Sequence, residues 1–313
     1  MNSTMNPTNH YAVIPISIIS ALVGISLACL IIGLIAATKR LHTATYLLIC
    51  NTCLSSTFYC VVQCNNYIFL NFIVWDTSDM SCQWRAYFTY MSIVAVVYSY
   101  LMQAISRYFF VVLSIKYRRV TSLKTHIILI ATQWIIVIFV PTPTIFSNSV
   151  YYIPSELCWV RMKFKLHVAY TFLFYYFLPT IGIITLYIYL FRRAKHSTNS
   201  TFARTLETSR QQSRDNSLFR NIMILFSIYI FGGFPTLLYL VLGNNILYYM
   251  GLVFVALAVA VEKAATLIVD RELRNIMKHI SRSLKTRVTP VKVDSVSGNV
   301  ARRNIKLVTP LKK

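Results

Sequence analysis

The sequence is poor in charge, and poorest in negative charge. Only 13% of its 313 residues are charged, with 9 Asp and Glu against 31 Lys and Arg. A soluble domain carries about 25% charged residues, so this composition excludes an ordinary cytosolic enzyme. The 8 Gly and 9 Pro are also too few for a collagenous or low-complexity chain.

The chain is instead rich in long hydrophobic runs, and 56% of its residues are hydrophobic. Each run is long enough to cross a hydrocarbon core of about 30 Å. Because lipid cannot bond backbone polar groups, each run is expected to be a helix. The predicted fold is all-α, an integral membrane bundle of seven transmembrane helices. The predicted spans are about 12–37, 45–70, 83–113, 126–146, 166–191, 219–242 and 246–269.

Basic residues gather in alternate linkers, after spans one, three and five. The other linkers hold only Arg85, Arg161, Lys163 and Lys165, offset by Asp76, Asp79 and Glu156. Because basic loops stay in the cytoplasm, we expect a multi-pass plasma-membrane protein with residues 1–11 extracellular and the C-terminus cytoplasmic. Asn2 opens an N-glycosylation sequon in this outer segment.

After the membrane domain, 12–269, apolar residues at helical spacing alternate with basic residues over 270–285. This pattern predicts an amphipathic helix that binds anionic lipids of the inner leaflet. A soluble helix is the alternative, although no soluble domain follows it. The basic segment 286–313 is poor in aromatics and is predicted to be a disordered cytoplasmic tail.

The sequence lacks the residues that other classes of function require. The basic residues flank apolar runs, so they do not indicate a nucleic-acid partner. The chain has no Gly-rich phosphate loop and no His-Glu-x-x-His motif, and His167 is a lone histidine. Seven cysteines fit no metal-ligand spacing. We expect no enzyme activity, no catalytic or metal site and no cofactor.

Several motifs occur in a consistent order along the predicted spans. Arg107 follows Cys82 by 25 residues, so the two mark opposite ends of the third span. The motifs are, in chain order, Trp75, Cys82, Ser106-Arg107-Tyr108, Trp134, Pro179 with Tyr187, and Pro235. Together they resemble the rhodopsin-like (class A) family of G-protein-coupled receptors, over about residues 12–285.

The resemblance implies a heterotrimeric G protein as partner and a disulfide between Cys82 and Cys158. It implies a coupling and activation site comprising Ser106, Arg107, Tyr108, Tyr187, Pro235 and Glu262. It also implies a ligand pocket comprising Thr89, Tyr90, Ile93, Tyr175, Thr236, Tyr239 and Leu252. The tyrosines have an alternative explanation, because tyrosine is common at membrane interfaces whatever the function.

The sequence departs from the family pattern, and we expect a divergent, orphan receptor. Ser106 stands where the family has an acidic residue beside the arginine. The resemblance therefore implies that Arg107 is held less firmly in the inactive state and that basal activity is raised. The span-six Cys-Trp-x-Pro is replaced by Gly232-Gly233-Phe234-Pro235. A hinge or close helix packing explains the two glycines equally well.

The seventh span carries Glu262-Lys263 where the family has Asn-Pro. The residues resembling the family's sodium site are Ser56, Val96 and Glu262, which offer too few oxygens for a hard cation. We therefore expect that sodium binds poorly here and does not act as an allosteric inhibitor. Since consecutive helical side chains diverge by about 100°, Lys263 is expected to reach toward the cytoplasmic interface, with Glu262 protonated or bonded to Ser56.

The resemblance predicts a receptor that binds an extracellular ligand and activates a G protein. Thr89 stands where monoamine receptors have an aspartate, so we expect a neutral, lipid-like or peptide ligand. Arg161, Lys163 and Lys165 offer carboxylate contacts at the rim. The alternatives are a seven-helix channel or transporter, for which more intramembrane charge is expected, and a receptor-like scaffold that no longer couples.

Overall fold

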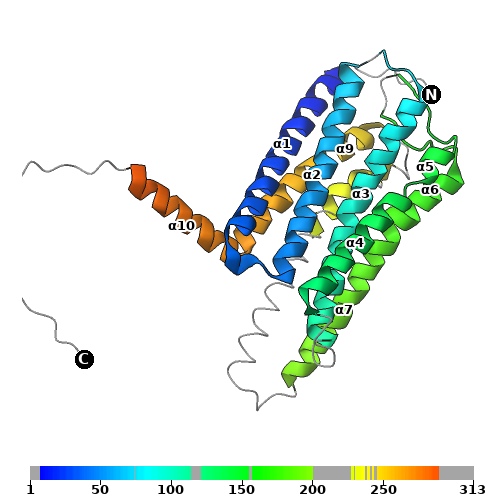
Figure 1. The fold of residues 1–313 in the computed structure, drawn as a ribbon. Coiled ribbons are helices and arrows are strands. Elements are labelled where there is room, and N and C mark those ends of the chain that lie inside the picture. Colours follow the sequence, from blue (N-terminus) through cyan, green and yellow to red (C-terminus); the bar gives the residue numbers. More distant parts are fainter. Residues whose placement is uncertain are drawn as a thin grey trace, which may run out of the picture.

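The computed structural model describes residues 8–73, 75–113, 121–154, 157–199, 227–228, 230–236, 238–239, 242 and 245–288. Long helices lie side by side as a bundle, and one further helix leaves it at an angle (Figure 1). The long helices of the bundle are α1 Thr8–Ala37, α2 Ala44–Asn71, α3 Asp79–Tyr108, α4 Leu123–Phe139, α7 Leu178–Asn199 and α9 Asn245–Val269. Shorter elements are η1 Lys39–Leu41, η2 Phe109–Leu113, α5 Pro143–Phe146, α6 Lys165–Thr171 and η4 Phe172–Phe177, and α10 is Arg271–Val288.

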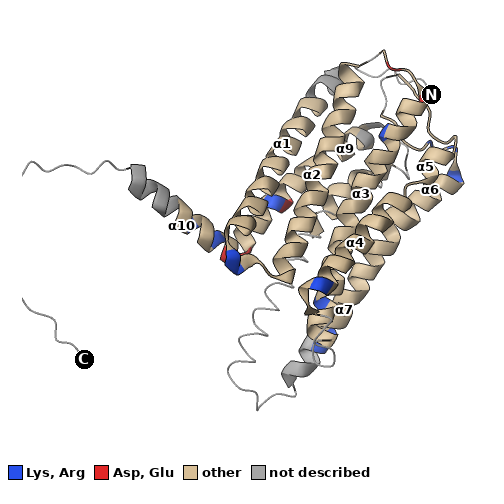
Figure 2. Ribbon diagram, viewed as in Figure 1, with Lys and Arg blue, Asp and Glu red and all other residues tan. Residues whose placement is uncertain are grey.

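Six helical segments of the described chain are long and apolar enough to cross a membrane. They coincide with six of the seven predicted spans. Of the predicted sixth span, residues 219–226 lie outside the described residues, and 231–236 are helical. The bundle is nearly free of Lys, Arg, Asp and Glu along its length, and most of these residues lie near its two ends (Figure 2).

Helix α3 is the centre of the bundle. It packs against α2, α4 and α7, and its apolar 18-residue stretch has the highest buried share, 72%, among the six candidate spans. Its hydroxyl groups bond to carbonyls of the same helix: Ser92 donates to Thr89 and Ser99 donates to Val96, both at 2.7 Å. These bonds satisfy polar groups that lipid would leave unpaired.

The fifth span contains a wide turn that the sequence analysis did not predict. Residues Phe172–Phe177 form a π-helical segment between α6 and α7, and the Leu178 N–H donates to the Leu173 carbonyl. Pro179 follows directly and has no N–H to offer the preceding turn. π-segments form where the regular hydrogen-bond ladder is interrupted in this way.

Asp270 separates α9 from α10. Its Oδ1 accepts hydrogen bonds from the N–H groups of Glu272 and Leu273, at 3.0 and 3.1 Å, and so caps the first turn of α10. Leu273 is fully buried in a cluster that includes Ile35 and Leu41. α10 extends to Val288, so the first three residues of the predicted tail are helical. Residues 289–313 lie outside the described residues, as does Asn2.

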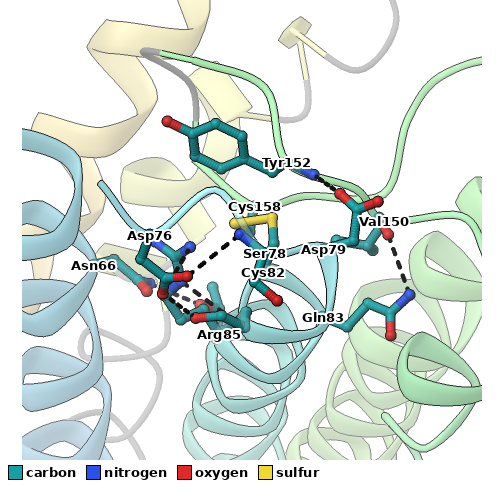
Figure 3. Close-up of a disulfide and its surroundings, with 12 residues drawn as sticks. Asn66, Asp76, Ser78, Asp79, Cys82, Gln83, Arg85, Val150, Tyr152 and Cys158 are labelled. Atoms are coloured by element: carbon teal, nitrogen blue, oxygen red, sulfur yellow. Dashed lines mark hydrogen bonds and ion pairs between the residues drawn. A yellow bond between two sulfur atoms is a disulfide. The ribbon is translucent and has the colours of Figure 1, made fainter. Parts of the chain in front are cut away.

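A disulfide joins Cys82 in the first turn of α3 to Cys158 in the loop before α6 (Figure 3). We call this end of the bundle the disulfide end and the opposite end of α3 the Arg107 end. The Asp79 carboxylate accepts a hydrogen bond from the Tyr152 N–H at 2.8 Å, and the Gln83 amide donates to the Val150 carbonyl at 3.4 Å. The loop is thus fixed to α3 at three points.

Asp76 organises the short connection between α2 and α3. Its carboxylate accepts hydrogen bonds from the Ser81 hydroxyl and, at 3.3 Å, from the Ser78 N–H, and lies 4.0 Å from the Arg85 guanidinium (Figure 3). The bonds from Ser81 and Ser78, together with Arg85, lower the pKa of Asp76 below its ordinary value. The carboxylate therefore stays charged and holds this connection against α3.

Replacing both Cys82 and Cys158 with serine is expected to reduce surface expression strongly. The bridge closes a long loop, and such a loop loses unfolded-state entropy worth about 2–4 kcal/mol. Surface and total protein are compared by immunostaining of intact and permeabilised cells. Cys29, an exposed free cysteine, provides the matched control Cys29→Ser. A double variant that reaches the surface in the same amount as the parent would show that the bridge is dispensable.

Candidate functional site

A cavity of about 410 Å³ opens at the disulfide end between the helices and the loop before α6. Its volume lies within the range of about 300–1,000 Å³ that is usual for small-molecule sites. Helices α2, α3, α6 and α9, the η4 turn, the loop and the helical residues near 236 all contribute to its wall. Six of the seven predicted pocket residues line it: Tyr90, Ile93, Tyr175, Thr236, Tyr239 and Leu252. Their role in ligand binding stays a prediction.

Thr89 is the predicted pocket residue that does not line the cavity. Its hydroxyl donates to the Arg85 carbonyl at 2.7 Å and accepts from the Asn66 side-chain amide at 2.7 Å. The side chain is 2% exposed. Both hydrogen bonds of the Thr89 hydroxyl are made to the protein. Thr89 therefore joins α3 to α2 behind the cavity wall.

Aromatic side chains form the wall beneath the loop. The Tyr90 hydroxyl accepts a hydrogen bond from the Val160 N–H at 3.0 Å. The Tyr90 ring centroid lies 5.5 Å from that of Trp159 and 5.3 Å from that of Tyr175. Tyr90 thus supports the loop with its hydroxyl and faces the η4 turn with its ring.

Two cations, Arg161 and Lys163, line the cavity, and none of the lining residues the structure describes is acidic. Both lie over the Tyr151 ring, with the Arg161 Cζ at 5.2 Å and the Lys163 Nζ at 4.6 Å from its centroid. Lys165, the third basic residue expected at the rim, is not among the lining residues. The cavity is therefore electropositive at the loop.

At the Arg107 end, Ser106 and Arg107 are both buried, with 1% and 8% exposure. The Ser106 hydroxyl lies 2.8 Å from the His126 Nε2, and the His126 Nδ1 lies 2.9 Å from the Ser122 carbonyl. A carbonyl only accepts, so the His126 Nδ1 carries a proton and donates it to the Ser122 carbonyl. Ser106 thus ties α3 to α4 in this structure.

The remaining predicted coupling residues at this end lie on the face between α3 and α7. Tyr187 is buried in a cluster with Ile183 and Tyr100. Tyr108 is partly buried, and its ring centroid lies 5.8 Å from that of Tyr189. α3 and α7 therefore meet through aromatic contacts beside Arg107.

The prediction that Lys263 reaches toward the membrane interface is wrong. Its Nζ lies 2.7 Å from the Glu262 Oε2, and the two residues are 1% and 3% exposed. The ammonium also donates to the Thr52 carbonyl of α2, at 3.5 Å. The long lysine stem bends back along α9, because a carboxylate inside the bundle attracts the ammonium far more strongly than it would in water.

The predicted bond between Glu262 and Ser56 is not present, and Glu262 contacts Lys263 instead. The Ser56 hydroxyl instead donates to the Thr52 carbonyl at 2.9 Å. The Gln103 amide donates to the Thr52 hydroxyl at 2.5 Å. Glu262, Lys263, Thr52 and Gln103 therefore form one polar chain that joins α9 to α2 and α3.

A second buried network joins α2 to α4. The Asn51 amide donates to the Gln133 Oε1 at 2.6 Å, and Trp134 Nε1 donates to the Asn51 Oδ1 at 3.0 Å. Gln133 also donates to the Ala95 carbonyl of α3, at 3.2 Å. The sequence analysis named Trp134 as a motif but overlooked Asn51 and Gln133, although amide side chains inside long apolar runs were a visible signal.

Of the two explanations for the glycines before Pro235, the structure favours close packing at Gly232. A Cβ placed there would overlap the Cβ of Ala258 and lie 3.2 Å from the Phe254 carbonyl of α9. At Gly233 a Cβ would meet the Tyr176 hydroxyl at 3.5 Å, an ordinary contact. Gly232 therefore allows the helical segment 230–236 to approach α9 closely.

The helices of the bundle are long and apolar enough to cross a membrane. A disulfide-linked loop lines an aromatic cavity at one end, and a buried arginine lies at the other end of α3. This combination is that of a helical membrane receptor. Residues 28–261 match the family described as 7 transmembrane receptor (rhodopsin family). Because this match covers more than half of the chain, the chain belongs to that family. It is thus a multi-pass, seven-transmembrane G-protein-coupled receptor of the rhodopsin-like class, with the all-α fold that the sequence predicts.

Replacing Glu262 with glutamine is expected to change basal signalling, whereas sodium is expected to leave the parent unaffected. The Lys263 ammonium already occupies the position beside the Glu262 carboxylate that a metal cation would need. Removing the carboxylate leaves that ammonium buried without its ion-pair partner, which typically costs about 3–5 kcal/mol. Basal G-protein activity is measured in membranes with sodium or with a bulky organic cation.

The double variant Glu262→Gln/Lys263→Met is the matched control. It removes both charges, so expression is expected to recover relative to Glu262→Gln alone. A clear sodium dependence of the parent, or unchanged basal and evoked activity in Glu262→Gln, would contradict a switching role for Glu262.

Proposed function

We propose that this receptor binds an extracellular ligand in the cavity at the disulfide end and activates a heterotrimeric G protein at the Arg107 end. The observation that supports this most is that both sites are built on α3. The cavity contains Tyr90 and Ile93, and Arg107 follows near the other end of the same buried helix. At 1.5 Å per residue, Ile93 and Arg107 lie about 20 Å apart along α3.

The proposal includes an orientation and a division of the chain. Residues 1–11 are extracellular, 12–269 form the receptor domain in the plasma membrane, 270–285 lie on the inner leaflet and 286–313 form the cytoplasmic tail. The disulfide end then faces the oxidising exterior, where disulfides persist. The receptor has no enzyme activity of its own.

Signalling follows from a two-state bundle. A ligand that binds the active arrangement more tightly shifts the population toward it by that difference in affinity. The Ser106–His126 contact between α3 and α4 and the Lys263–Thr52 contact between α9 and α2 are made in the present arrangement.

The ligand is neutral, lipid-like or a peptide rather than a monoamine. A small cation entering the cavity would meet Arg161 and Lys163 and no carboxylate among the described lining residues. Burying a charge without a partner costs several kcal/mol. An amine would therefore bind only with a large desolvation penalty.

A channel or transporter is the weaker alternative. Such proteins carry lines of ionisable groups through the membrane. The deep charges on α9, Glu262 and Lys263, are paired with each other instead. A receptor-like scaffold that does not couple is the other alternative, because the span-six and span-seven motifs are altered.

Replacing Arg107 with alanine is expected to lower G-protein activation strongly at normal surface expression. Removing a charge-assisted contact worth about 1.5–3 kcal/mol lowers coupling by about tenfold or more. Basal and ligand-evoked G-protein dissociation is followed in cells by resonance energy transfer. Arg192→Ala changes an exposed arginine of α7 and provides the matched control.

The same assay separates the alternatives. An ion current without G-protein dissociation would favour the channel. A parent protein that reaches the surface and activates none of the G-protein classes, basally or with any ligand, would favour the scaffold.

The 270–313 peptide is expected to bind liposomes that contain anionic lipid, and to bind less as salt rises. α10 buries Leu273 and exposes Arg271 and Lys278, and a basic segment near an anionic surface gains about 1 kcal/mol per basic residue. Phosphorylation at Thr289 and Thr309 adds negative charge and is expected to weaken binding. Binding is measured by co-sedimentation, with neutral liposomes as the control. Binding that ignores both salt and lipid charge would contradict this.

A further inference from the structure

The two cations of the cavity are held where a ligand would enter. Arg161 and Lys163 follow the disulfide residue Cys158 by three and five positions, so the bridge and the Val160–Tyr90 hydrogen bond fix the backbone beside them. Both side chains lie over the ring of Tyr151, which also lines the cavity. The ring brings two positive charges together that would otherwise repel one another.

The acidic residues at this end that the structure describes are engaged elsewhere. Asp76 accepts hydrogen bonds from Ser81 and Ser78, and Asp79 accepts one from the Tyr152 N–H (Figure 3). Neither lines the cavity. The described lining carries two cations and no carboxylate. Such a lining is complementary to an anionic group of a ligand, and an arginine in particular suits a carboxylate.

Deeper in the cavity the wall is apolar and aromatic, with one buried acceptor. Gln63 on α2 is 3% exposed, and its Oε1 accepts no hydrogen bond from the described part of the protein. It lies eight residues before Asn71 at the end of α2, which places it about 12 Å in from that end. A buried amide oxygen without a donor is costly, and a donor group on a ligand would satisfy it.

We propose that the cavity binds an amphipathic organic anion, which is compatible with the lipid-like and peptide alternatives of the proposed function but not with the neutral one. Its carboxylate lies between Arg161 and Lys163, and its aromatic or aliphatic body packs among Tyr90, Ile93 and Tyr175. A hydroxyl or amide N–H at the far end donates to the Gln63 Oε1. This inference rests on the proposed function only for the consequence of binding, because binding itself is measured on the purified receptor.

The test compares matched probes on the full-length receptor in nanodiscs of neutral phosphatidylcholine. The probes are biphenylacetic acid, its uncharged amide biphenylacetamide and the cation biphenylethylamine. Isothermal calorimetry or ligand-observed NMR gives the affinities. We expect the acid to bind roughly tenfold or more tightly than the amide, as for a charge-assisted hydrogen bond, and the amine to bind weakest.

Substitutions test whether Arg161 and Lys163 cause the preference for the acid over the amide. The double variant Arg161→Gln/Lys163→Gln is expected to bind acid and amide equally. Lys165→Gln is the matched control, since Lys165 has the same charge and lies two residues from Lys163 but does not line the cavity. It should retain the preference for the acid.

Gln63→Leu tests the inner end. A hydroxylated biphenylacetic acid, with the hydroxyl on the ring remote from the carboxylate, is expected to bind the parent several-fold more tightly than biphenylacetic acid does. In Gln63→Leu the two acids should bind alike, while the preference for acid over amide persists. This outcome requires a folded cavity, so it also controls for damage to the protein.

Four results would overturn the inference: no binding of the acid, equal affinity for acid and amide, tighter binding of the amine, or an acid preference that survives the double variant. Its failure differs from failure of the proposed function. Acid binding without G-protein dissociation would contradict signalling alone. Activation by a ligand without an anionic group, with no acid binding, would contradict the inference alone.

Discussion

Buried polar groups in this bundle depend on partners within the protein, because lipid offers none. That constraint explains why several buried polar side chains are linked into networks. The pair Glu262–Lys263 continues through Thr52 to Gln103, and Asn51 is shared between Gln133 and Trp134. These contacts hold α2, α3, α4 and α9 together in the interior of the bundle.

The fold was predictable from the sequence because a bilayer imposes both length and secondary structure on each span. The positions of six spans followed from hydropathy alone. The π-helical turn at Phe172–Phe177 was not predicted, since Pro179 indicates an interrupted ladder without showing how the chain absorbs it. The extension of α10 to Val288 was missed as well, because basic composition alone does not mark where a helix ends.

The sites were predicted less completely. Motif order located the cavity wall, but it could not show that Thr89 turns its hydroxyl to Asn66 and Arg85. Helical geometry suggested that Lys263 diverges from Glu262, whereas the low dielectric of the interior draws the flexible ammonium back. The contact between Ser106 and His126 joins residues 20 positions apart in the sequence and is made only when α3 and α4 pack.

The buried ion pair of α9 also bears on how the chain is made. An isolated helix carrying both charges would enter the bilayer at a penalty of about 2.5–3.5 kcal/mol for each charge at its centre. α9 is synthesised after α1 and α2, and it packs along α1 and reaches the Thr52 carbonyl of α2. Insertion of α9 is thus expected to depend on packing against α1 and α2, which are already in the membrane, as well as on the hydrophobicity of α9 itself.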